Sequence, residues 1–125
     1  MANTRVQAPT LQQFSALYVE KALLGQMFSE RGIPEALGFL EPTDFCDSLN
    51  RAIYAALCAL QAQGERADFA RILDQMRQDG TRNDLELAGG LLYFYECIDM
   101  YLALGGGQVY ARRILELAGK RRVGE

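Results

Sequence analysis

No segment of this sequence alternates apolar and polar residues over a useful length, so the pattern favours no half-buried β-strand. Apolar residues instead recur three and four positions apart, the spacing that places side chains on one face of an α-helix. Leu49, Ile53, Leu57 and Leu60 are the clearest example. The sequence therefore predicts an all-α fold, a single compact bundle of about six helices.

Each expected helix is bounded by residues that start or stop helices. Asp47 or Ser48 and then Asp68 offer side-chain oxygens as N-caps. Gly64 lies where a left-handed C-cap is expected, and Gly80 closes the next helix. The expected ranges are 10–31, 34–40, 48–63, 69–79, 90–104 and 108–122, with a polar turn at 81–83. Predicted core residues are Ile53, Leu57, Phe94 and Ile98.

A chain of 125 residues is the size of one domain, and its composition (half apolar, 23% charged) is that of a globular protein. We expect a loosely held arm at 1–9, a helical domain at 10–122 and a short tail at 123–125. The longest apolar stretch, 91–104, is too short and too charged to span a bilayer. No signal peptide is visible, so a cytoplasmic protein without membrane contact is expected.

The residue types restrict the chemistry. The sequence lacks histidine, which excludes imidazole acid–base catalysis, serine–histidine nucleophiles and histidine metal ligands. Its three cysteines fit no zinc or redox spacing and are expected to be reduced and mostly buried. Residues 105–107 are glycines before a helix, but they fit neither a dinucleotide-binding nor a Walker A pattern. We therefore expect no catalytic residue, no cofactor and no metal site in this chain.

The net charge of −3 is unevenly distributed. Residues 112–125 hold five basic and two acidic residues, a net charge of +3, which leaves −6 on residues 1–111. Cations near a helix C-terminus are expected from the helix dipole alone, and no aromatic residue follows to stack on bases. We therefore expect nucleic acid to be bound only weakly or indirectly. The candidate contacts are Arg112, Arg113, Lys120, Arg121 and Arg122.

The segment 91–104 is apolar at twelve of its fourteen positions, more than a single helix stripe buries. Its two acids, Glu96 and Asp99, lie one turn apart and are expected to face water. At about 100° per residue, the opposite side of this helix is expected to be core. That side holds Phe94, Cys97, Ile98 and Tyr101.

Leu92, Tyr93 and Met100 fall on or beside the acidic side of the same helix. Water normally covers such positions, so these three residues are the candidates for a protein interface. A helix that is apolar nearly all round is either central in its bundle or covered by a partner. Both alternatives stay open at this point.

Six short landmarks follow one another along the chain. They are residues 20–25, 40–45, 50–54, 60–68, 89–93 and 110–114. In this order and spacing they resemble the N-terminal domain of the bacterial replicative DNA helicase, the DnaB family, over residues 17–122. The family usually has histidine where Asn50 stands. Each landmark also has a physical interpretation: Gly25 permits close helix approach, Phe45 plugs the bundle, and Gly89 and Gly90 allow a tight helix entry.

The resemblance implies a domain that performs no chemistry but forms the helicase collar, pairs with neighbouring subunits and docks primase. The implied partners are a second copy, in a dimer or higher homo-oligomer, and a primase-type protein. The helical hairpin and ATPase domain that follow in the family are absent from this sequence. If the chain is a fragment, its parent would be an ATP-dependent replicative helicase. The alternative is a stand-alone adaptor or inhibitor, of phage or plasmid type, that mimics the collar and binds helicase or primase.

Overall fold

The computed structural model describes residues 11–105 and 107–124, with side chains for 16–105, 107 and 110–119. Within these residues the regular elements are all helical. The α-helices are α1 (Leu11–Glu30), α2 (Ser48–Ala62), α3 (Phe69–Asp79), α4 (Arg82–Leu87), α5 (Leu91–Leu104) and α6 (Gln108–Gly124). Two 3₁₀ turns, η1 (Glu35–Leu37) and η2 (Pro42–Asp44), separate α1 from α2. The predicted all-α fold is confirmed; the arm at 1–9 lies outside the described residues.

Two short segments differ from the prediction. The helix expected at 34–40 is only the turn η1, because so few residues cannot offset helix nucleation and Pro42 keeps Glu41 extended. The turn expected at 81–83 is wrong, since α4 begins at Arg82. Leu85 is fully buried and anchors α4, so tertiary packing outweighs the polar local sequence. The number of α-helices therefore agrees with the prediction, although α4 takes the place of the helix expected at 34–40.

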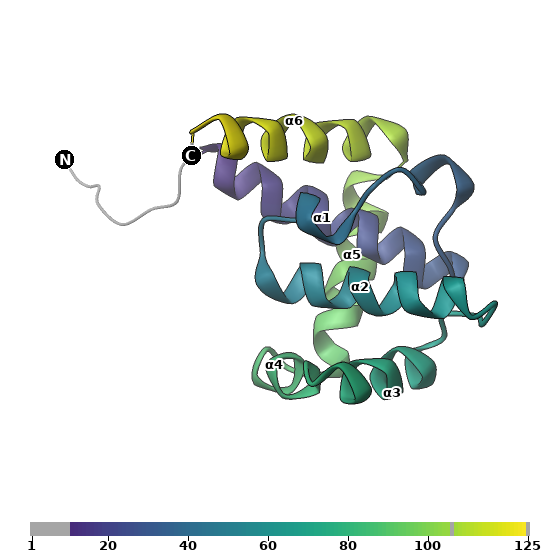
Figure 1. Cartoon of the computed structure of the whole chain (residues 1–125). Coiled ribbons are helices and arrows are strands. Elements are labelled where there is room, and N and C mark those ends of the chain that lie inside the picture. Colours follow the sequence, from purple (N-terminus) through teal and green to yellow (C-terminus); the bar gives the residue numbers. More distant parts are fainter. Residues whose placement is uncertain (1–10, 106, 125) are drawn as a thin grey trace.

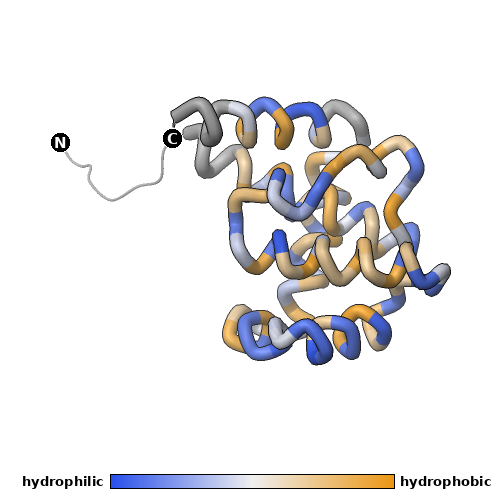
Figure 2. Tube along the Cα trace, in the orientation of Figure 1, coloured by the Kyte–Doolittle hydropathy of each residue, from blue (hydrophilic) through white to orange (hydrophobic). Residues whose placement is uncertain are grey.

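The helices are arranged around α1 and α5, which pack against each other at the centre. Figure 1 shows α6 beside α1 at one end of the molecule and α3 with α4 at the other, with α2 between them. In this view α5 passes behind α1 and α2 and connects the two ends. Figure 2 shows that hydrophilic residues dominate α3, whereas α2 is mostly apolar. One face of α5 is therefore covered by α1.

The local signals for helix ends are confirmed. The Asp47 and Asp68 carboxylates each accept a hydrogen bond from the backbone N–H three residues on, at 3.0 and 2.9 Å. Gly64 and Gly80 have φ of 72° and 80°, the left-handed conformation that glycine adopts without steric cost. These ends set the lengths of α2 and α3, and so the position of the loop between them.

The predicted core is confirmed at three of four positions. Ile53, Leu57 and Phe94 are buried, whereas Ile98 is only half-buried at the edge of the core. Phe45 is fully buried after the Pro42 turn, as expected. Its ring stacks on that of Tyr54, with ring centroids 4.8 Å apart, so the segment before α2 is fastened to that helix.

We expect Tyr54→Phe to lower the free energy of unfolding by about 1–2 kcal/mol, because it removes a hydrogen bond and keeps the ring. The buried Tyr54 hydroxyl donates to the Leu40 carbonyl oxygen at 2.8 Å. Urea unfolding followed by circular dichroism measures the loss. Tyr95→Phe, at an exposed ring, is the matched control and should change stability by less than about 0.5 kcal/mol. Equal losses in the two variants would contradict the prediction.

Candidate protein interface on α5

The rotation of α5 is set first by its crossing with α1. A Cβ placed on Gly25 would lie 2.0 Å from the carbonyl oxygen of Cys97 and 2.9 Å from the Cα of Ile98. Only glycine allows two backbones to approach this closely. The expectation for Gly25 is confirmed, and Cys97, which is fully buried, faces α1.

A buried hydrogen-bond network also fixes the rotation of α5 about its own axis. The Glu20 carboxylate on α1 accepts from the backbone N–H groups of Cys46 and Asp47, at 2.6 and 3.3 Å, and from the Asn50 side-chain amide at 2.9 Å. The Asn50 carbonyl oxygen in turn accepts from the Tyr93 hydroxyl. This Glu20–Asn50–Tyr93 network therefore joins α1, α2 and α5 through their interior.

Burial shifts the pKa of two groups in this network, the Glu20 carboxyl and the Tyr93 hydroxyl. It raises the pKa of Glu20 above its ordinary value, against the opposing effect of the hydrogen bonds from Asn50, Cys46 and Asp47. It also raises the pKa of the Tyr93 hydroxyl, which stays protonated and can donate. On the outer side, the Lys21 ammonium lies 4.9 Å from the centroid of the Tyr93 ring. Tyr93 is thus enclosed on both sides.

The three predicted interface residues do not share one surface. Leu92 is 68% exposed, Met100 is half-buried, and Tyr93 is only 8% exposed. The expectation that Tyr93 lies on the solvent side is therefore wrong. The buried side of α5 is centred nearer to Cys97 than the positions of the acids indicate, because the Gly25 contact and the Asn50 bond rotate the helix.

Besides Leu104 at its C-terminal end, four large apolar side chains of α5 remain in contact with solvent. Their exposed fractions are 43% for Leu91, 68% for Leu92, 52% for Tyr95 and 74% for Leu102. Glu96 and Asp99 are exposed on the same side. We call these six residues the α5 face. Sequence reasoning missed Leu91, Tyr95 and Leu102, although the excess of apolar positions in this segment pointed to the right helix.

The basic end of the chain is helical through Gly124. Arg112 is exposed, and Arg113 donates to the Glu116 carboxylate at 3.0 Å, which satisfies part of its charge. The side chains of the other candidates, Lys120, Arg121 and Arg122, lie outside the described residues. A contact between this end and nucleic acid therefore stays a prediction.

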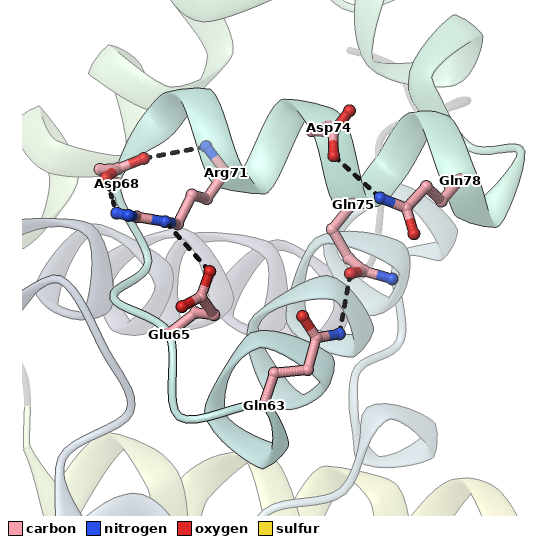
Figure 3. A network of polar contacts seen from close by, with 7 residues as sticks. All are labelled: Gln63, Glu65, Asp68, Arg71, Asp74, Gln75 and Gln78. Carbon is pink, nitrogen blue, oxygen red and sulfur yellow. Dashed lines mark hydrogen bonds and ion pairs between the residues drawn. The ribbon is translucent and has the colours of Figure 1, made fainter.

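A polar groove between α2 and α3 is bridged by a hydrogen bond between its own side chains. Figure 3 shows the Gln63 amide directed to Gln75 and the Arg71 guanidinium between Glu65 and Asp68. The donor–acceptor distance between Gln63 and Gln75 is 3.3 Å. These side chains pair with one another across the groove, and the network therefore holds α3 against the C-terminal end of α2.

The three cysteines are free thiols, with Cys97 buried and Cys46 and Cys58 half-buried. Within the described part of the chain, no three acidic, cysteine or histidine side chains cluster as metal ligands would. Over the same residues, no helix combines the length and the apolar character that crossing a membrane requires.

Comparison with known proteins identifies the class to which this fold belongs. The family model described as the DnaB-like helicase N terminal domain matches residues 12–116, so the chain belongs to that family. Among solved structures, it is similar to the crystal structure of the N-terminal domain of DnaB helicase from Mycobacterium tuberculosis. The two share 27% sequence identity with a TM-score of 0.65, over 86% of this chain and 79% of that one. A search of curated proteins found no match. The resemblance read from the sequence is confirmed.

Proposed function

We propose that this chain is a non-catalytic assembly and interaction domain of DNA replication, which mediates subunit pairing and docks a primase-type protein. Membership of the DnaB-like family and the collar-like fold support a role beside a replicative helicase, in the cytoplasm. The observation that carries the interaction role is the α5 face. Leucine and tyrosine side chains that remain exposed in a row mark a surface for another protein, and aromatic residues are enriched at interface centres.

Sedimentation velocity with and without primase tests the proposal. We expect the wild type to associate with primase and Leu92→Asp to lose this association, because a carboxylate in an apolar contact must be desolvated. Leu92 points into solvent, so the variant should retain the helical circular dichroism of the wild type. Self-association is measured in the same runs on the chain alone.

Phe39→Asp is the matched control. Phe39 is an exposed aromatic residue between η1 and η2, off the α5 face, and its replacement should leave the complex with primase intact. A wild type that stays monomeric and ignores primase contradicts the proposal, and so does a Leu92→Asp variant that associates like wild type. Binding to an intact DnaB-type helicase, without self-association, would instead favour the stand-alone adaptor or inhibitor.

A further inference from the structure

We infer that the α5 face takes a cationic amphipathic helix from its docking partner. The inference rests on the proposed function and names the chemistry of the partner segment that the face accepts. It assigns this surface to a protein of different sequence and leaves subunit pairing to another surface.

The apolar part of the face has the shape of a helix-docking row. Leu91, Tyr95 and Leu102 project within about 40° of one another and extend over about 16 Å, or three helical turns. A partner helix laid along such a row inserts its own apolar residues at every third or fourth position. A segment of three to four turns is long enough to cover the row.

The flank of this row is acidic. Asp99 is exposed and makes no ion pair among the described residues. Glu96 has one ion pair, at 3.3 Å from Lys21, yet 59% of its side chain remains exposed. The α5 sequence contains no lysine or arginine to balance these two charges. A partner therefore meets leucine and tyrosine in the row and carboxylates beside it.

The two carboxylates beside the row favour a cationic helix over a second copy of α5 as the partner. A two-fold contact places the same patch of both copies together, so α5 against a second α5 brings Glu96 and Asp99 near their own copies. Like charges brought together at an interface oppose association. A helix with lysine or arginine beside its apolar stripe instead pairs with the two carboxylates while its leucines cover the row. The cationic helix is thus the better occupant.

Fluorescence anisotropy with synthetic peptides tests the inference. The probe is a labelled amphipathic helix with leucine at every third or fourth position and lysine on the flanks; its twin has glutamate in place of lysine. We expect the lysine peptide to bind at least about tenfold more tightly than its twin, with an affinity that falls as salt is added. The double variant Glu96→Gln, Asp99→Asn should lose most of this preference.

Glu35→Gln is the matched control, because it removes one exposed negative charge at η1, away from α5. It should bind the lysine peptide like wild type, and amide chemical-shift changes on binding should concentrate in residues 91–103. Equal binding of the two peptides overturns the inference, as does a loss in Glu35→Gln as large as that in the double variant. Primase docking that depends on Leu92 would then still stand, so failure of the inference and failure of the proposed function are distinguishable.

Discussion

Gly25→Ala should cost more than about 4 kcal/mol of unfolding free energy and leave α1 and α5 unable to pack as they do. The added Cβ would lie 2.0 Å from the carbonyl oxygen of Cys97 and 2.5 Å from its carbonyl carbon. Both are backbone atoms, so no side-chain rotation relieves the overlap and the helices must separate. Separation removes packing along the most extensive helix–helix contact among the described residues. Urea unfolding followed by circular dichroism measures the effect.

Gly119→Ala is the control for this variant. Gly119 also lies within a helix, α6, but a Cβ there meets no atom within 4 Å. Alanine at this position should therefore stabilise the helix by up to about 1 kcal/mol, the usual difference in helix propensity. A Gly25→Ala variant with the wild-type urea midpoint would show that α1 and α5 do not cross as closely as described.

The second large effect is expected at the centre of the buried network. Glu20→Ala removes the acceptor for two part-buried backbone N–H groups and for the buried Asn50 amide. We expect a loss of about 2–4 kcal/mol at neutral pH, measured by urea unfolding. Glu30→Ala is the control, since Glu30 is exposed at the end of α1 and accepts only from Gln26. Its effect should stay below about 0.5 kcal/mol.

The pH dependence of the Glu20→Ala effect has a definite sign. Because burial raises the pKa of Glu20 in the folded state above its ordinary value of 4.5, the folded protein binds this proton more readily than the unfolded chain. Its stabilising contribution is fully present below pH 4.5 and declines as pH rises through the folded pKa. The difference in stability between wild type and Glu20→Ala should therefore be larger in acid than at neutral pH. A difference that grows with rising pH would contradict this assignment.

Local chemistry explains why most of the fold could be predicted. The N-caps Asp47 and Asp68 and the left-handed Gly64 and Gly80 act within a few residues, so the sequence alone locates the ends of α2 and α3. One exception is α4, whose polar start favours a turn. Burial of Leu85 against the other helices stabilises it as a helix, and that contact is not local.

The candidate interface was less predictable because it depends on how far α5 is rotated about its axis. The periodicity of apolar residues locates the buried side of a helix only to within the angle between neighbouring side chains around its axis. In α5 even this signal is weak, because the helix is apolar nearly all round. Its rotation depends on the backbone contact with Gly25 and on the bond from Tyr93 to Asn50, which join residues far apart in the sequence. Leu92 was identified correctly as exposed, whereas Tyr93 was assigned to the wrong side.

The donors of the buried network all point in one direction. The Tyr93 hydroxyl donates to the Asn50 carbonyl oxygen, and the Asn50 amide donates to Glu20, so the aligned dipoles end on the carboxylate. A neutral imidazole at this position would also offer one donor and one acceptor. A protonated imidazole offers two donors and no acceptor, so the Tyr93 hydroxyl could no longer donate to it. Because an amide keeps one of each at every pH, Asn50 links a hydroxyl group on α5 to a carboxyl group on α1 without itself gaining or losing a proton.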